Sequence, residues 1–177
     1  MKNKYTLPVT FTIRFDKTDR NTYLLSTRQI LPLPRETAFS FFEKPENLSE
    51  ITPDWLNLRF DNKGMQSRTF KGAEYDYSIR WLAVTMRWHT RISEYRPPEM
   101  FTDVQVSGPY ALWTHLHTFE TVIEGTLIRD FVTYRVPFGF LGKILHSMII
   151  KKQLQDIFSY RAVRIAAWAD ETFQRKD

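Results

Sequence analysis

Apolar and polar residues alternate along several segments of the chain, which is the pattern of strands that bury one face. Between Glu74 and Leu82, aromatic or aliphatic side chains occupy every second position from Tyr75 to Trp81. Similar patterns predict strands at 22–31, 55–61, 85–95, 100–106, 113–121 and 126–136. Because consecutive strands are joined by short connections, we predict an antiparallel meander.

Apolar residues at intervals of three and four predict helices near both ends of this meander. Pro34 suits the first turn of a helix that continues to Lys44, and a second short helix spans 46–50. The chain has no proline between Leu141 and Phe173, where apolar residues recur with helical spacing. This stretch predicts a long amphipathic C-terminal helix.

Together these elements predict an α+β fold, in which a curved antiparallel sheet wraps around the C-terminal helix and two short helices follow the first core strand. A length of 177 residues is the size of one domain. Residues 22–174 hold the core, and residues 1–21 form an N-terminal extension. Within the extension, the alternation in 9–15 predicts an extra strand, followed by a polar turn at 16–21.

The composition is that of an ordinary globular protein, with 42% hydrophobic and 25% charged residues. The aromatic content is high at 15%, contributed by 14 Phe, 8 Tyr and 5 Trp. A compact core of this size needs fewer rings, so the excess predicts a cavity lined by aromatic side chains.

Other features exclude several functional classes. The longest apolar run, around 144–150, is far shorter than the ~20 residues of a membrane span. The N-terminus lacks the apolar core of a secretory signal, and the chain has no cysteine for disulfides or thiolate chemistry. We therefore expect a cytoplasmic protein. The net charge of +5 is dispersed among acidic residues without a nucleic-acid motif, so we expect no nucleic-acid partner.

Three stretches of the sequence resemble a known group of proteins: FFEKPENLSEITPDWL (41–56), FTDVQVSGPYALWTHLHTFE (101–120) and GTLIRDFVTYRVPFGFLG (125–142). The words GPY, W-x-H-x-H-x-F and D-x-V-x-Y-x-x-P-x-G are similar to those of the START, birch-pollen-allergen and polyketide-cyclase superfamily (SRPBCC), in particular its bacterial ligand-binding, cell-division-inhibitor-like members. The resemblance covers about residues 22–174. It implies a helix-grip fold with a deep cavity between sheet and long helix, and it implies no single chemistry.

Two histidines, His115 and His117, lie two positions apart on a predicted strand, so their side chains share one face. Antiparallel neighbours would bring them close to Asp103 and Asp130. A histidine beside a carboxylate can act as a general acid or base. The candidate catalytic residues are therefore Asp103, His115, His117 and Asp130.

Three interpretations of these histidines are open. They can be structural, hydrogen-bonded to the two acids and joining strands, which we favour slightly over direct catalysis because buried polar groups must be paired in any case. A zinc site would need three or four ligands at ~2.0–2.2 Å, which His115 and His117 with Asp103 or Asp130 could supply. No third histidine lies at a recognised metal-ligand spacing, so we predict neither a metal site nor a cofactor.

The sequence favours a non-enzymatic protein that binds a small hydrophobic or amphipathic molecule, such as a lipid, polyketide or aromatic metabolite. The alternative is a cyclase or dehydratase-type enzyme that uses a His–Asp pair on a polyketide-like substrate. The predicted ligand-binding residues are Tyr77, Trp81, Trp88, Asp103, Gln105, Tyr110, Trp113, His115, His117 and Tyr134.

Two segments are expected to form a mobile rim over the cavity mouth, the residues 136–145 and the loop around Gly108. Phe138 and Phe140 lie in the first segment, close to Lys143 and to the lysine pair that follows at 151–152. Rings beside basic residues are compatible with weak peripheral contact to an anionic membrane, although a simple connection to the helix is the favoured interpretation.

Overall fold

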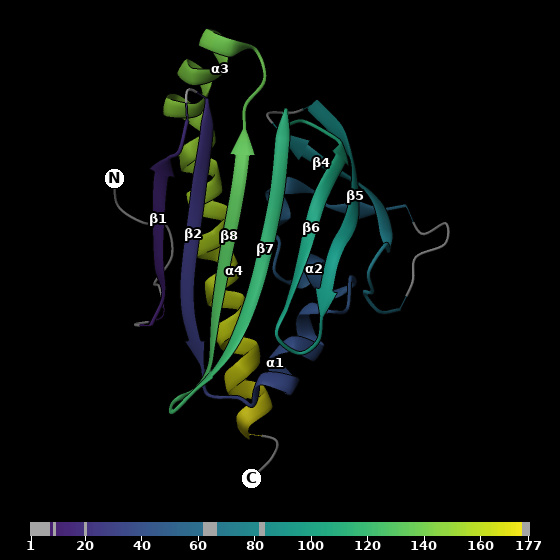
Figure 1. Ribbon diagram of the computed structural model, residues 1–177, viewed down its shortest axis with the longest axis vertical. Helices are drawn as coiled ribbons and strands as arrows, with labels where there is room; N and C mark the ends of the chain where they lie inside the picture. The colour runs from purple at the N-terminus through teal and green to yellow at the C-terminus, as the bar shows by residue number, and fades with distance from the viewer. Residues whose placement is uncertain (1–7, 9, 20, 62–66, 82–83, 175–177) are drawn as a thin grey trace.

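The computed structural model describes residues 8, 10–19, 21–61, 67–81 and 84–174. Within these ranges the strands form one antiparallel sheet in the order β1-β2-β8-β7-β6-β5-β4-β3 (Figure 1). The strand bounds are Thr12–Lys17 (β1), Thr22–Leu31 (β2), Arg59–Phe60 (β3), Glu74–Trp81 (β4), Val84–Arg96 (β5), Met100–Ser107 (β6), Leu112–Val122 (β7) and Gly125–Arg135 (β8). Each strand from β4 to β8 pairs with the next, so the predicted meander is confirmed.

Alternating burial in β7 and β8 shows which face of each strand turns inward. Trp113, His115, His117 and Phe119 are buried along β7, and the residues between them are half-buried. The same alternation along β8 buries Asp130. A period of two in the sequence therefore assigned these faces correctly, because successive side chains of a strand point to opposite sides.

The sheet curves around α4 (Lys151–Gln174), which runs along one of its faces (Figure 1). Register shifts in the pairing of β5 with β6, between His89 and Thr90 and between Ile92 and Glu94, bend the sheet as β-bulges do. Two clusters of buried apolar side chains join helix to sheet. One cluster contains Ile165 and Ala169 of α4, and the other contains Leu154 and Phe158.

Two short helices, α1 (Arg35–Phe42) and α2 (Asn47–Glu50), follow β2 as predicted. The predicted strand 55–61 is wrong in its first half, where a 3-10 helix spans Asp54–Leu56 and only the two residues of β3 are extended. Pro53 leads into this tight turn, and Asn57 leaves it with a positive φ of 44°. A strand cannot pass through a left-handed residue without interruption.

The C-terminal helical region begins earlier than predicted and is not uniform. It consists of α3 (Gly139–Leu145), a π-helical turn at His146–Ile150 and then α4. A Cβ on Gly142 would lie 2.1 Å from the Pro137 carbonyl oxygen, so this close approach requires glycine. The segment 136–145, which the sequence predicted as part of a mobile rim, is helical from Gly139 onward. Figure 1 shows α3 projecting beyond the end of the sheet.

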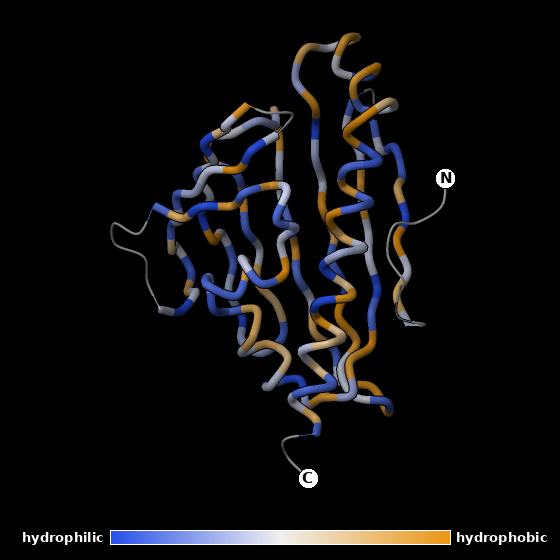
Figure 2. The backbone as a smooth tube through the Cα atoms, turned by 180° about the vertical axis from the view of Figure 1, so that it is seen from behind, coloured by the Kyte–Doolittle hydropathy of each residue, from blue (hydrophilic) through white to orange (hydrophobic). Residues whose placement is uncertain are grey.

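Apolar and polar residues alternate in patches along α4, as the view from behind shows (Figure 2). No helix in the part of the chain that the structure describes combines the length and apolar character needed to cross a membrane. In the N-terminal extension, β1 pairs with β2 at the edge of the sheet. It begins later and ends later than the predicted 9–15, and Val9 lies outside the described residues.

Candidate functional site

A cavity of about 260 Å³ lies between the sheet and α4, close in size to the smaller known ligand pockets. The sheet contributes Tyr77, Trp88 and Trp113 to its wall, and α4 contributes Ile157 and Phe158. These positions follow from the two periods in the sequence. Every second residue of a strand and every third or fourth residue of the helix face the same space.

Aromatic rings contact one another along the sheet side of the cavity. Tyr77 and Trp88 are stacked with ring centroids 5.8 Å apart, and Trp88 meets Trp113 edge-on at 5.2 Å. Tyr110, from the loop between β6 and β7, packs 4.8 Å from Trp113. Such contacts hold bulky rings in fixed positions, so this part of the wall is a firm apolar surface.

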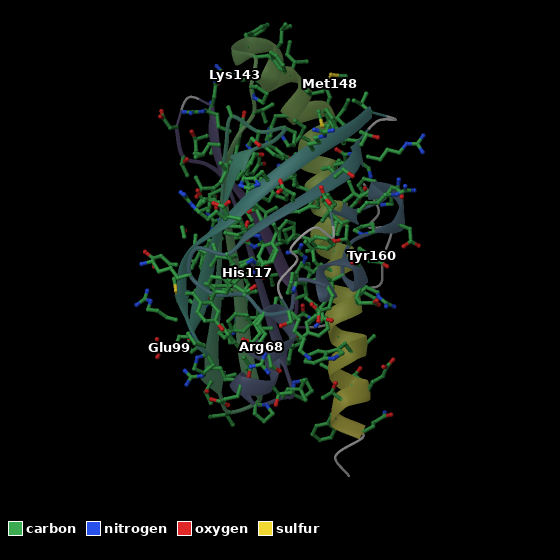
Figure 3. All side chains as sticks on the ribbon, turned by 90° about the vertical axis from the view of Figure 1, so that its right-hand side faces the viewer. Arg68, Glu99, His117, Lys143, Met148 and Tyr160 are labelled. Carbon is green, nitrogen blue, oxygen red and sulfur yellow. The ribbon has the colours of Figure 1, made fainter. Side chains whose placement is uncertain are left out.

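Four polar side chains form a separate region that we call the His–Asp quartet: Asp103, His115, His117 and Asp130. Asp103 of β6 pairs across the sheet with His115, and His117 pairs with Asp130 of β8. Antiparallel register therefore brings the four together, as the sequence predicted. Figure 3 shows His117 on the strands, on the side that faces α4.

Each histidine of the quartet contacts both carboxylates. The Nε2 atom of His115 lies 3.0 Å from Asp130 Oδ1, and its Nδ1 atom lies 3.6 Å from Asp103 Oδ2. For His117, Nε2 lies 3.2 Å from Asp103 Oδ2 and Nδ1 lies 2.9 Å from Asp130 Oδ1. The contacts of His115 Nε2 and His117 Nε2 have hydrogen-bond geometry, whereas the contact of His117 Nδ1 does not.

The quartet is closed on one side and open on the other. Thr27 of β2 donates a hydrogen bond of 2.7 Å to Asp130 Oδ2, and the Asp130 side chain is only 8% exposed. Asp103 is 19% exposed and, with both histidines, lines the cavity. Asp130 thus supports the quartet from behind, and Asp103 is its accessible carboxylate.

Burial and mutual contact determine the charges of these groups. Burial raises the pKa of both carboxyls, but the hydrogen bonds and charges of the two histidines outweigh it, so the pKa of Asp103 is lowered and that of Asp130 lies well below its usual range. Burial and the neighbouring His117 lower the pKa of His115. Burial also opposes protonation of His117, yet the two carboxylates raise its pKa.

Arg161 of α4 lines the cavity near the quartet and was missed in the sequence. Its guanidinium lies 4.9 Å from the ring centroid of Phe158, and its Nε atom has no hydrogen-bond partner among the described residues. Burial lowers its pKa, against the attraction of Asp130 and Asp103. The available signal was an arginine within the apolar stripe of the helix, between Phe158 and Ile165.

The predicted ligand-binding residues divide into two groups. Eight of them line the cavity: Tyr77, Trp81, Trp88, Asp103, Tyr110, Trp113, His115 and His117. Gln105 is turned to the backbone of Tyr110, from which it accepts and to which it donates hydrogen bonds of 3.2 and 2.7 Å. Tyr134 is fully buried and bonded to His146 at 2.8 Å. These two side chains hold other parts of the structure instead of facing the cavity.

Both segments that the sequence predicted to form a rim contribute to the cavity wall. Pro109, Tyr110 and Phe138 all line the cavity. Trp81 at the end of β4, which also lines the cavity, donates a hydrogen bond to Gln153 of α4, which joins strand to helix. Gln153 had no signal in the sequence, since a polar residue near the start of a long helix is ordinarily solvated.

Comparisons with known proteins agree with this architecture. The model of the family described as "Polyketide cyclase / dehydrase and lipid transport" matches residues 31–158. A search among curated proteins finds no match.

Solved structures with the same fold include a protein from Chromobacterium violaceum, with a TM-score of 0.62, 14% identity, and coverage of 82% of this chain and 96% of that one. Ara h 8.0201 gives a TM-score of 0.58 at 14% identity, covering 85% and 99%. The di-domain ARO/CYC StfQ from the steffimycin biosynthetic pathway gives 0.62 at 11% identity, covering 88% of this chain and 53% of StfQ. At such identities the likeness shows the fold alone.

The family match spans most of the chain, and the structure has the helix-grip architecture of a curved sheet around a long C-terminal helix. The chain therefore belongs to the polyketide cyclase/dehydrase and lipid transport family of the SRPBCC superfamily.

Proposed function

We propose that this protein binds a small amphipathic molecule in the cavity between the sheet and α4, without transforming it. The observation that carries the proposal is the lining, which is mainly aromatic and aliphatic and includes one group of polar side chains, Asp103, His115, His117 and Arg161. Such a surface suits a ligand with a large apolar body and one polar end. The rings of Trp88 and Trp113 would cover the apolar body, and the quartet with Arg161 would face the polar end.

Binding is favoured over proton transfer by the contacts of the histidines. All four ring nitrogens of His115 and His117 lie within 3.6 Å of a carboxylate oxygen of the quartet. A general base needs a nitrogen that can reach the substrate proton. Here the protein itself occupies these positions, which supports a role in holding and orienting a ligand.

Native mass spectrometry of the protein as isolated tests the proposal directly, because a co-purifying molecule would identify the ligand class. A second test is titration with the fluorescent amphipathic dye anilinonaphthalene sulfonate. Ile157→Trp would fill part of the cavity and should weaken dye binding by about 10-fold or more, which corresponds to about 1.4 kcal/mol. Ala167→Trp, at an exposed position of the same helix, is the matched control and should bind as the wild type does.

Equal dye affinity in both tryptophan variants, with no molecule bound to the purified protein, would contradict the cavity as the binding site. Turnover of a bound ketone by the wild type would instead support the enzymatic alternative and contradict simple binding.

A further part of this proposal is that the ligand is exchanged at an anionic membrane. The end of the molecule where α3 projects beyond the sheet supports it (Figure 1). Phe138, Phe140 and Met148 are 77%, 72% and 70% exposed there, an unusual concentration of apolar surface. Residues 136–155 contain three lysines and no acidic residue. Figure 3 shows Lys143 and Met148 together at this end. Because Phe138 also lines the cavity, membrane contact would occur at its mouth.

Co-sedimentation with vesicles of mixed phosphatidylcholine and phosphatidylglycerol tests this exchange surface. Wild type should bind, and Phe138→Ala/Phe140→Ala should bind several-fold less, because apolar insertion and lysine attraction act together. Ile123→Ala is the control, since Ile123 is fully exposed on the β7–β8 turn, away from the end that carries α3. Absence of wild-type binding would rule out the membrane contact and leave the cavity proposal intact.

A further inference from the structure

The two nitrogens of each quartet histidine face different carboxylates in a regular way. His115 Nδ1 and His117 Nε2 both point toward Asp103 Oδ2, at 3.6 and 3.2 Å. Their remaining nitrogens both point toward Asp130 Oδ1, at 3.0 and 2.9 Å. Asp103 therefore faces one nitrogen of each ring, and Asp130 lies near the other nitrogen of each ring.

The spacing on the Asp103 side is that of ligand atoms around a metal ion. Asp103, His115 and His117 can each offer one ligand atom, and these atoms all lie within 4.8 Å of one another. Bonds of about 2.0–2.2 Å around a tetrahedral or octahedral ion place neighbouring ligand atoms about 3.0–3.5 Å apart. The two contacts to Asp103 are close to this range, so a shift of a few tenths of an ångström would complete the geometry.

Asp130 occupies the place of an outer partner. Metal-binding histidines commonly donate their second ring N–H to a carboxylate, which fixes the tautomer and the orientation of the ring. Asp130 Oδ1 accepts a hydrogen bond from His115 Nε2, and its Oδ2 atom is held by Thr27 at 2.7 Å. The same Oδ1 atom lies 2.9 Å from His117 Nδ1 without hydrogen-bond geometry. Asp130 therefore orients the His115 ring and lies beside the second nitrogen of His117.

The contact between His115 and Asp103 also requires an explanation. A histidine that donates Nε2–H to Asp130 presents, when neutral, a lone pair at Nδ1. That lone pair faces the carboxylate oxygen of Asp103 at 3.6 Å, which is too long for a hydrogen bond. Two acceptors that face each other at the cavity wall are unfavourable, and a cation between them would remove this cost.

We propose that Asp103, His115 and His117 bind a divalent transition-metal ion of the zinc or iron(II) class at the cavity wall. Two imidazoles and one carboxylate are a ligand set that both ions accept. Three protein ligands leave at least one coordination position open, and because all three residues line the cavity, that position faces it. The site goes beyond the proposed ligand binding and does not depend on it, although an oxygen atom of a bound molecule would be able to occupy the open position.

The sequence alone predicted no metal site, because the three ligands are not marked by any known motif. The third ligand comes from another strand, and only the register of β6 against β7 brings it to the H-x-H pair. The proposal therefore rests on three-dimensional geometry and not on a newly recognised pattern.

The experiment is titration of chelator-treated protein with zinc(II), cobalt(II) and, without oxygen, iron(II). We expect one equivalent of metal per chain and visible absorption bands for the cobalt form. His117→Gln and Asp103→Asn should weaken binding by about 100-fold or more, and Asp130→Asn by about 10- to 100-fold. His89→Gln is the matched control, because His89 also lies beside two acids, Asp76 and Glu74, but on the outer face.

A measurement on the wild type avoids dependence on how well the variants fold. In nitrogen-15 spectra of the four histidine rings, zinc should shift the resonances of His115 and His117 and leave those of His89 and His146 unchanged. Failure of the folded protein to bind any of the three ions stoichiometrically would overturn the proposal. So would metal-induced shifts confined to His89, since they would place the ion on the outer face.

Discussion

The two faces of the sheet hold the same chemistry in different surroundings. On the inner face, the quartet combines histidines with aspartates whose side chains are 19% and 8% exposed. On the outer face, His89 contacts Asp76 at 2.8 Å and Glu74 at 3.4 Å, and these acids are 64% and 50% exposed. The distances are alike, yet the outer acids are largely exposed to water and the inner ones are largely buried. Burial, and not the list of contacts, should decide their energies.

The largest difference is expected when one carboxylate is removed from each face. Asp130→Ala would leave two buried histidines and Thr27 without their common partner and should lower the free energy of unfolding by about 3–5 kcal/mol. Asp76→Ala should lower it by less than about 1 kcal/mol, because the exposed pair is screened by water. Urea denaturation followed by circular dichroism measures both values. Equal losses in the two variants would refute the comparison.

The fourth histidine sharpens the comparison, because the buried His146 has no carboxylate partner among the described residues. It lies 2.8 Å from the Tyr134 hydroxyl and stacks on Tyr23 with ring centroids 3.6 Å apart, and burial followed by the charge of Lys151 lowers its pKa to about 4. Its usual pKa is about 6.5, so the unfolded chain takes up the proton first as the pH falls. Stability from His146 is complete above about pH 6.5 and should be lost between about pH 6.5 and 4, by roughly 1–3 kcal/mol.

The measurement is the free energy of unfolding at several pH values for wild type and His146→Gln. Other histidines titrate in the same interval, so the difference between the two curves isolates His146. That difference should shrink as the pH is lowered from 7 to 4. A constant difference would show that His146 carries the same proton in the folded and unfolded states.

The smallest expected effect concerns one hydroxyl on each face. Thr27→Val removes the donor to Asp130 Oδ2 and should cost about 1–2 kcal/mol, because a buried charged acceptor loses a partner. Thr118→Val removes a longer bond of 3.4 Å to the Arg129 carbonyl on the half-buried outer side and should cost about 0.5 kcal/mol or less. Thermal unfolding of the two variants at matched pH resolves the difference. A larger loss in Thr118→Val would contradict the assignment of the two faces.

The sequence was most informative where a short period determines the structure. Alternation placed His115 and His117 on one face of β7, and antiparallel pairing of neighbouring strands predicted that they lie close to Asp103 and Asp130. Both inferences need only the order of the strands and the geometry of a pleated sheet. The long helix followed from its proline-free apolar stripe for the same reason. The register that pairs His115 with Asp103 and His117 with Asp130 came from the structure.

Other features depend on contacts between distant segments and leave a weak local signal. Arg161 faces the cavity because α4 packs across the sheet, and its place within the apolar stripe of the helix is only a weak sign of this in the sequence. Gln105 was assigned to the cavity from its strand face, but it bonds to the nearby loop at Tyr110 instead. The 3-10 turn at Asp54–Leu56 depended on a left-handed Asn57, which apolar patterning does not report.

The hydrogen bond between Thr27 and Asp130 joins residues that are 103 positions apart in the chain. The meander from β4 to β8 consists of neighbours in sequence, whereas β2 must close a much longer loop to reach β8. Contacts of such sequence separation slow the folding of small proteins, because a long loop must close before they form. A quartet with Thr27 in place therefore requires that β2 has docked on β8. The ring resonances of His115 and His117 should accordingly report this docking step during folding.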